Sequence, residues 1–316
     1  MVLISIVFFF IALLSIGLGL TLLVKESDNF LERNLMRLGI GLGAFITLGL
    51  LLNLIGILLD YRIFFGISIL CILLWYLKNR KSLSMQISRL KLTQTNLFIF
   101  VMLALFFVTF FMYHRGAFSY PYLEDDDSWG HALGTKYVSV EKTVFSGKIG
   151  MRYLDPYPPA YDMVFGVLHQ TNNSVYWTLK FFNALIISLS LVFFYFFAKV
   201  LTEDSRKALF STFALFAMPS FLSHFIWSIA ITMPLFFVSF YSVEKIKEDK
   251  KWWIVAAVVI TATLVTSPTH SVYFGLFFAL YLAIKMLVER KAPLYESLAG
   301  FSGLALSFAF WWLPMI

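Results

Sequence analysis

The sequence has almost no cysteine and little charge. Its one cysteine, Cys71, lies inside an apolar run, which excludes an intrachain disulfide. Charged residues make up 14% of the chain, about half of what a soluble domain carries. The sequence also has no glycine-rich phosphate loop, no zinc-type spacing of cysteine and histidine and no nucleophile elbow. These absences exclude a disulfide scaffold, an ordinary water-soluble composition and the best-known nucleotide, zinc and hydrolase motifs.

Apolar residues dominate the composition of the chain. They make up 60% of the 316 residues, and the mean hydropathy is +0.81. Many apolar runs approach the roughly 20 residues that a membrane-spanning helix needs. The first run lacks a basic segment and a cleavage site, so it predicts a retained span rather than a signal peptide. We expect an all-α polytopic membrane protein with about ten spans, near residues 2–24, 38–59, 63–77, 97–113, 174–198, 208–222, 225–243, 252–267, 271–288 and 295–315.

Basic residues gather in four groups, each two predicted spans from the last. Because lysine and arginine collect in cytoplasmic loops, one orientation places all four groups inside. The long loop 114–173 and the turns 220–224 and 267–270 then face outside, which predicts a plasma-membrane protein with an extracytoplasmic site. The net charge of +7 reflects basic loops beside anionic lipid rather than nucleic-acid binding. The groups are Lys78, Arg80, Lys81, Arg89 and Lys91; Lys199, Arg206 and Lys207; Lys245, Lys247, Lys250 and Lys251; and Lys285, Arg290 and Lys291.

No internal repeat or low-complexity linker divides the chain. The first three predicted spans and the basic stretch behind them predict an N-terminal three-helix membrane unit, residues 1–91. The remaining residues, 92–316, predict a second membrane unit that contains the outer loop 114–173. The chain ends on Trp311-Trp312-Leu313-Pro314-Met315-Ile316, which indicates either an end at the membrane surface or a longer protein, and we favour the longer protein.

The outer loop contains four consecutive acids, Glu124-Asp125-Asp126-Asp127, followed by Ser128-Trp129-Gly130-His131. Such a run is often a solvated loop or a helix N-terminus, where the helix dipole favours carboxylates. If a helix starts near Asp127, then Asp127 and His131 lie on one face. Crowded carboxylates raise a pKa and so can form a general base. Asp125, Asp127 and His131 are equally suitable ligands for a divalent cation such as Mg or Mn, and the residues leave both interpretations open.

A second motif, Tyr157-Pro158-Pro159, follows later in the same loop. Met163, Val164, Val167 and Leu168 come after it at helical spacing. Proline is favoured in the first turn of a helix, so this pattern predicts an amphipathic helix that starts at the prolines and lies on the membrane interface.

The order of the acidic run, His131-Ala132, about 25 residues and a Tyr-Pro-Pro helix start resembles the first outer loop of the GT-C glycosyltransferase superfamily. This superfamily includes protein mannosyltransferases, lipid A aminoarabinose transferases and the catalytic subunits of oligosaccharyltransferase. The resemblance covers roughly residues 97–316 and is sharpest across 124–161. It implies a GT-C-like core of about seven spans. It also implies transfer of a sugar from a polyprenyl-phosphate donor to a lipid, glycan or protein acceptor on the outer side.

The resemblance also suggests roles for individual residues. Asp126 and Asp127 match the acidic motif, with Asp125 and Glu124 as rivals because a run of four acids leaves the register open. His131 would orient the base or bind a metal. Lipid-phosphate or donor contacts would come from cationic and polar groups at the outer ends of spans, although each could also be a structural interface residue. These candidates are Arg152, Lys180, His224 and His270.

Two other classes of function stay open. A transporter or flippase usually places ionisable groups near the membrane midplane and contains inverted repeats, and the sequence shows neither. A non-catalytic subunit that binds a lipid-linked glycan would need only the recognition surface. Many GT-C members carry a soluble C-terminal domain that these 316 residues do not include, which is compatible with this last class.

Overall fold

The computed structural model describes residues 2–80, 93–145, 154, 156–218 and 225–315, and this part of the chain contains helices and no strands. The predicted all-α class is therefore confirmed. A π-helical turn, Phe308–Trp312, continues the last helix. The helices are α1 (Val2–Thr21), α2 (Phe30–Leu54), α3 (Tyr61–Asn79), α4 (Gln94–Ser119), α5 (Asp126–Glu141), α6 (Ala160–His169), α7 (Val175–Thr202), α8 (Ser205–Phe216), α9 (Ile229–Glu244), α10 (Trp252–Leu264), α11 (Pro268–Glu289) and α12 (Leu294–Ser307).

Seven of the ten predicted spans correspond to helices that are long and apolar enough to cross a membrane. They are α1, α2, α3, α4, α7, α11 and the stretch Ile229–Lys247, which is α9 with the short turn after it. The chain therefore has the multi-pass character that the sequence predicts. The other three predicted spans are the shorter helices α8, α10 and α12, with 12, 13 and 14 residues. A straight crossing of the hydrocarbon layer takes about 20 residues, so α8 and α10 are too short by themselves, whereas the π-helical turn extends α12 to Trp312.

The helix starts follow from the local sequence. Six helices begin directly after an Asn, Asp, Ser or Thr whose side-chain oxygen accepts a backbone N–H of the first turn. Such a cap satisfies one of the donors that a helix N-terminus leaves without a partner. The caps are Asn29, Asp60, Thr93, Asp125, Ser174 and Asp204.

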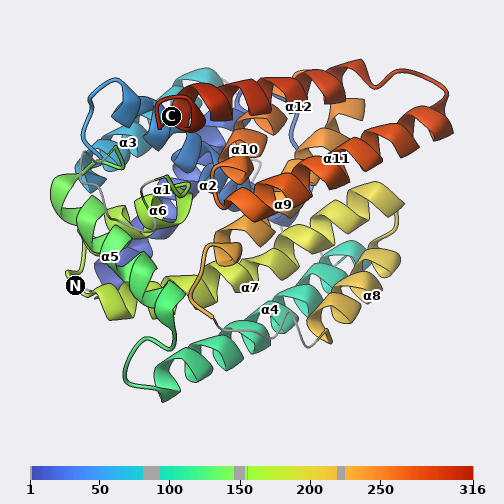
Figure 1. Ribbon diagram of the computed structural model, residues 1–316. Coiled ribbons are helices and arrows are strands. Elements are labelled where there is room, and N and C mark those ends of the chain that lie inside the picture. Colours follow the sequence, from blue (N-terminus) through green and yellow to red (C-terminus); the bar gives the residue numbers. More distant parts are fainter. Residues whose placement is uncertain (1, 81–92, 146–153, 155, 219–224, 316) are drawn as a thin grey trace.

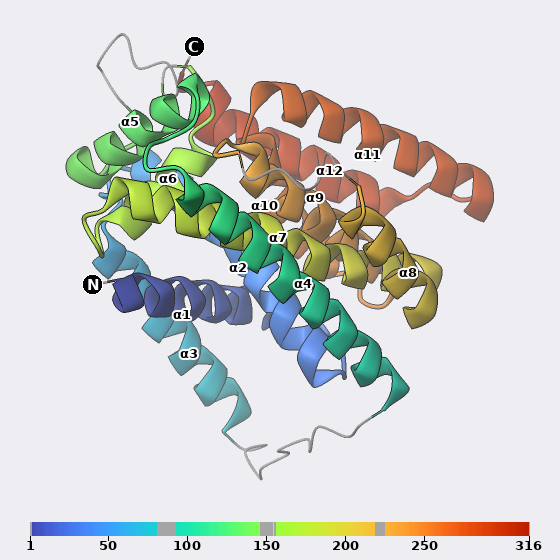
Figure 2. The same ribbon diagram turned by 90° about the horizontal axis from the view of Figure 1, so that it is seen from below.

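The helices form one bundle around α2, α7, α9 and α10 (Figures 1 and 2). In both views α1 and α3 lie along one flank, α4 and α8 along another, and the α11–α12 hairpin along a third. In the most apolar stretch of α2 and of α7, 72% of the residues are buried, against 11% for α3 and 22% for α11. Because the exposed side chains of α3 and α11 are apolar, a lipid environment suits these outer helices.

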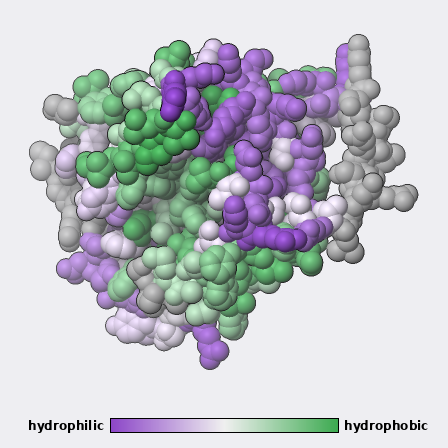
Figure 3. Space-filling model, turned by 90° about the vertical axis from the view of Figure 1, so that its right-hand side faces the viewer, coloured by the Kyte–Doolittle hydropathy of each residue, from purple (hydrophilic) through white to green (hydrophobic). Residues whose placement is uncertain are grey.

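The two ends of the bundle differ in character. We call the end that carries α5 and α6 the cap end and the opposite end the basic end. At the basic end, Lys199 pairs with Glu32 at 2.6 Å and Lys285 pairs with Glu296 at 2.6 Å. Figure 3 looks onto this end and shows hydrophilic side chains gathered over it. Members of all four predicted basic groups lie here, whereas Lys81, Arg89 and Lys91 are outside the described residues.

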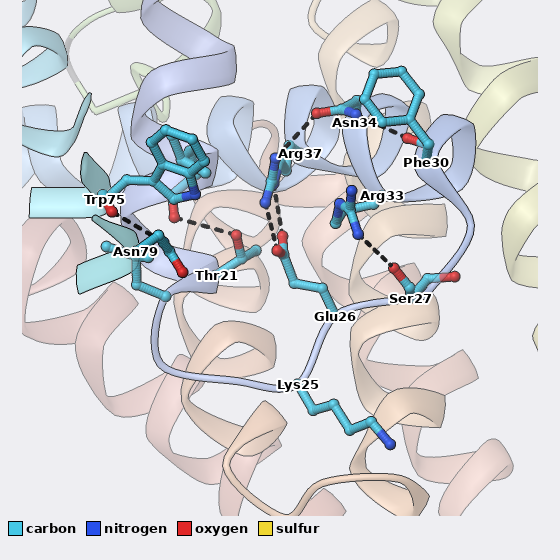
Figure 4. Close-up of polar contacts among 12 residues, drawn as sticks. Thr21, Lys25, Glu26, Ser27, Phe30, Arg33, Asn34, Arg37, Trp75 and Asn79 are labelled. Atoms are coloured by element: carbon cyan, nitrogen blue, oxygen red, sulfur yellow. Dashed lines mark hydrogen bonds and ion pairs between the residues drawn. The ribbon is translucent and has the colours of Figure 1, made fainter. Parts of the chain in front are cut away.

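The connection between α1 and α2 forms one wall of a polar cavity of about 460 Å³ at the basic end. Figure 4 shows how this connection is held: Arg37 pairs with Glu26, and Arg33 donates to the carbonyl of Ser27. The Trp252 indole donates to the carbonyl of Lys25 at 3.0 Å, which ties the connection to α10. Each buried carboxylate in this cavity, Glu32 or Glu244, has a lysine and a tyrosine hydroxyl as partners.

Two glycines let α1 and α2 touch backbone to backbone. A Cβ on Gly17 would overlap the carbonyl oxygen of Arg37, and a Cβ on Gly41 would overlap the carbonyl oxygen of Leu13. The other faces of α2 pack against α6, α7, α9 and α10. Whether residues 1–91 form a separable unit stays a prediction, but α2 makes contacts in both halves of that division.

Candidate functional site

The acidic run forms the start of α5 at the cap end. Asp125 is the N-cap: its Oδ1 accepts the backbone N–H of Ser128 at 2.8 Å and lies 2.9 Å from the Ser128 hydroxyl. Asp126 is exposed and Asp127 is half-buried, both in the first turn, where the helix dipole favours negative charge. Asp127 and His131 are therefore one turn apart on one helix, as the sequence predicts.

Loss of the Asp125 side chain, which is the N-cap of α5, is expected to destabilise this end of the bundle. Asp125→Ala should lower the free energy of unfolding by about 1 kcal/mol, because the N-terminus of α5 loses its acceptor. Asp125→Asn should cost much less, since asparagine caps equally well. Thermal unfolding in detergent measures both variants, and equal losses for Ala and Asn would show that charge rather than capping is what matters.

The helix behind the prolines begins where the sequence predicts, but it does not lie on the membrane interface. Pro159 is the N-cap of α6, and all ten residues of α6 are buried. The helix packs against α5, α2, α7 and α1. The Ala160 N–H also donates to the carbonyl of Val265, at the end of α10. The interfacial interpretation is wrong because α5 covers the side of α6 that would otherwise face lipid or water.

The contact between α5 and α6 contains a buried histidine–aspartate hydrogen bond that the sequence did not reveal. His131 Nδ1 lies 2.8 Å from Asp162 Oδ1, and both side chains are 1% exposed. The ring of Tyr161 lies 4.4 Å from the His131 ring. Burial raises the pKa of the Asp162 carboxyl, and the neighbouring His131 opposes that rise. Asp162 is the one acid in an otherwise apolar helix start, which is the only signal the sequence offers for it.

A second histidine joins the same two helices about two turns further along. His169 Nδ1 lies 2.7 Å from the Ser139 hydroxyl. Burial, with a further contribution from the positive charge of Lys136, lowers the pKa of His169 to about 4. The unfolded chain, with an ordinary histidine pKa near 6.5, thus binds a proton at a higher pH than the folded chain does.

This difference predicts that acid destabilises the protein through His169. Stability should be full above about pH 6.5, fall as the pH drops toward 4, and lose no more below that. The melting temperature in detergent, measured between pH 7.5 and 4, checks the slope. His169→Gln should flatten it, and an unchanged slope in that variant would contradict the prediction.

Lys180, a predicted phosphate contact, reaches the acidic segment from the start of α7. Its Nζ donates to the carbonyl of Tyr120 at 2.5 Å and lies 5.7 Å from the centre of the Phe118 ring. The side chain is 4% exposed, so the ammonium does not extend into solvent, and Glu124 lies within electrostatic reach. Lys180 therefore anchors the chain between α4 and the acidic run.

The other predicted contacts are only partly placed. His270 lies in the first turn of α11, with Nδ1 3.0 Å from the Ser267 hydroxyl and its ring 6.2 Å from the Trp227 ring. This position is at the cap end, and a role for His270 in donor binding stays a prediction. Arg152 and His224 lie outside the described residues.

The predicted metal ligands do not form one cluster. Asp125 caps α5, His131 pairs with Asp162, and in the described part of the chain no group of three or more His, Cys, Asp or Glu side chains could hold a metal ion. The side chains of Asp125, Asp127 and His131 thus do not fit a shared divalent cation in this arrangement. The acids, His131 and Lys180 do lie at one end of the bundle, where carboxylates, a cation and a buried His–Asp pair meet.

Comparisons with protein-family models, with curated proteins and with solved structures found no match to this chain.

Proposed function

We propose that this protein is a membrane glycosyltransferase of the GT-C type. It would move a sugar from a polyprenyl-phosphate donor to a lipid, glycan or protein acceptor at the cap end, on the extracytoplasmic face of the plasma membrane. The observation that supports this most is that Lys180 binds the segment leading into the acidic turn of α5. A cation and several carboxylates therefore share one end of a membrane bundle, where a lipid-linked phosphate would lie.

The proposed reaction needs a base and a group that attracts phosphate. Asp127 or Asp126 would take the proton of the acceptor hydroxyl, whose oxygen forms a bond to C1 of the sugar. The bond from C1 to the phosphate oxygen breaks, and its electron pair leaves with the polyprenyl phosphate. Lys180 has three N–H donors, and the bond to Tyr120 uses one of them. Its charge would stabilise the departing phosphate, with Arg152, His224 and His270 as further candidate contacts.

The positions of the buried charges favour chemistry at a bundle end over transport. Among the described residues, every buried acidic or basic side chain lies within two turns of a helix end, or in the cap helices α5 and α6. Transporters instead use ionisable groups near the membrane midplane. The buried set is Glu32, His131, Asp162, His169, Lys180, Glu244, Lys245, Lys285 and Glu296.

Reconstitution of the purified protein into liposomes tests the proposal. The donors would be polyprenyl phosphates that carry a hexose, an amino sugar or a pentose, supplied with lipid and glycan acceptors. We expect release of polyprenyl phosphate that depends on both donor and protein, and chelation with EDTA tests the predicted Mg or Mn requirement. Movement of intact donor across the bilayer without release would indicate a flippase. Donor binding with neither release nor movement would indicate a non-catalytic subunit, and either result overturns the proposal.

A further inference from the structure

We propose that Asp162 is a positioning residue for the acidic turn of α5. It holds His131, and through His131 it sets the direction in which Asp127 is presented. This inference rests on the proposed function, and it adds a residue from α6 to a site that otherwise comes from α5 and α7.

The pair lies where it can control the acidic turn. His131 follows Asp127 by one helical turn, so rotation of α5 about its axis moves both side chains together. The His131 ring is fixed on two sides, by Asp162 Oδ1 at 2.8 Å and by the Tyr161 ring at 4.4 Å. Tyr161 is itself held, because its hydroxyl donates to Asn183 Oδ1 in α7 at 2.9 Å. A chain of contacts thus runs from the core helix α7 to the start of α5.

A neighbouring contact shows that these two helices can be joined without a carboxylate. His169 and Ser139 link the same helices with a neutral hydroxyl at 2.7 Å. A fully buried carboxylate is costly, and residues of neutral or apolar character often stabilise such an interface equally well. The aspartate at residue 162 therefore points to a role beyond holding α5 and α6 together. A carboxylate fixes the tautomer and the orientation of the imidazole in a way that a hydroxyl does not.

The environment of the Asp162 carboxylate is energetically unfavourable for one of its two oxygens. Its second oxygen, Oδ2, is buried and has no hydrogen-bond partner among the described residues. Gly134 of α5 lies directly against this oxygen, and a Cβ at Gly134 would overlap it. A glycine at this point lets α5 approach while the carboxylate still faces His131. Gly134→Ala is therefore a way to displace the Asp162 carboxylate without a change of charge.

Histidine-selective 15N spectra and transfer kinetics test the inference together. In the wild-type protein we expect His131 in a single tautomer, with the proton on Nδ1 donated to Asp162. Asp162→Asn should change that signal and lower kcat by about 100-fold, since small displacements of a catalytic group have effects of that order. The KM for the donor should not change. Gly134→Ala should act in the same direction, which keeps the test valid if Asp162→Asn folds poorly.

The matched controls lie in the same interface. Ser139→Ala and His169→Gln should alter the melting temperature but leave kcat and the His131 signal unchanged. The double variant His131→Gln with Asp162→Asn should lose no more kcat than either single variant, because the two residues act as a unit. The inference is overturned if Asp162→Asn retains the wild-type kcat or His131 signal, or if the control variants lose as much kcat. Absence of transfer from every donor by the wild-type protein overturns the proposed function, and the His131 signal then still decides whether Asp162 fixes the ring.

Discussion

Replacement of Asp126 and Asp127 together by asparagine is expected to reduce sugar transfer by a factor of about 10²–10⁴, the usual contribution of a general base. Asparagine has nearly the same shape as aspartate but cannot take up the proton of the acceptor hydroxyl. Asp126 is exposed and Asp127 is half-buried in the first turn of α5, so the fold should survive. Release of polyprenyl phosphate from reconstituted protein measures the effect.

The control for this experiment neutralises two acids at the other end of the molecule. Asp28 and Glu203 are exposed and line the cavity at the basic end. Asp28→Asn with Glu203→Gln removes the same total charge and should leave transfer unchanged. If the Asp126 and Asp127 variant transferred sugar at the wild-type rate, neither carboxylate would be the base. Equal losses in both double variants would indicate an effect of net charge.

The largest expected effect on stability comes from Gly17 and Gly41. Leucine at either position would push α1 away from α2, because the first added atom meets a backbone carbonyl that cannot rotate aside. Overpacking typically costs about 1–3 kcal/mol, and these sites should lie at or above the upper end of that range. We expect a lower melting temperature in detergent and more proteolysis of the α1–α2 connection.

Gly66 in α3 provides the matched control. A Cβ at this position meets nothing within 4 Å. Gly66→Leu makes the same change of side chain in a nearby helix and should leave stability unchanged or raise it slightly, because leucine favours helix more than glycine does. A melting temperature for Gly41→Leu that equals that of Gly66→Leu would contradict the close approach of α1 and α2.

Local features of the sequence predicted the helices well because their causes are local. Apolar runs identified seven helices that are long and apolar enough to cross a membrane. Their starts were located less well: the second predicted span begins at residue 38, whereas α2 begins at Phe30, directly after the Asn29 cap. The same reasoning overestimated the length of the short helices. The run 252–267 is apolar throughout, but α10 ends at Leu264, and α11 begins at Pro268, a favoured residue in a first helical turn.

The candidate site was harder to predict because its key contact is not local. The spacing of Met163, Val164, Val167 and Leu168 shows that one face of α6 is apolar. It cannot show that Tyr161, Asp162 and His169 on the remaining faces are also covered. Asp162 and His131 are 31 residues apart, and no periodicity connects them. The acidic run and Lys180 were recognised by residue type alone, whereas their connection through the Tyr120 carbonyl required the structure.

The ion pair between Glu32 and Lys199 has a consequence for how the protein is made. The two residues are separated by 167 positions. At about 5–20 residues per second, the ribosome completes Glu32 roughly 10–30 s before its partner exists. During that interval α2 carries the Glu32 carboxylate without the lysine that pairs with it in the folded protein. The faces of α2 that pack against α7, α9 and α10 also have no partner yet. The order in which the helices enter the membrane therefore differs from the order in which they can assemble. A nascent chain halted before Lys199 should leave α2 exposed to membrane quality control.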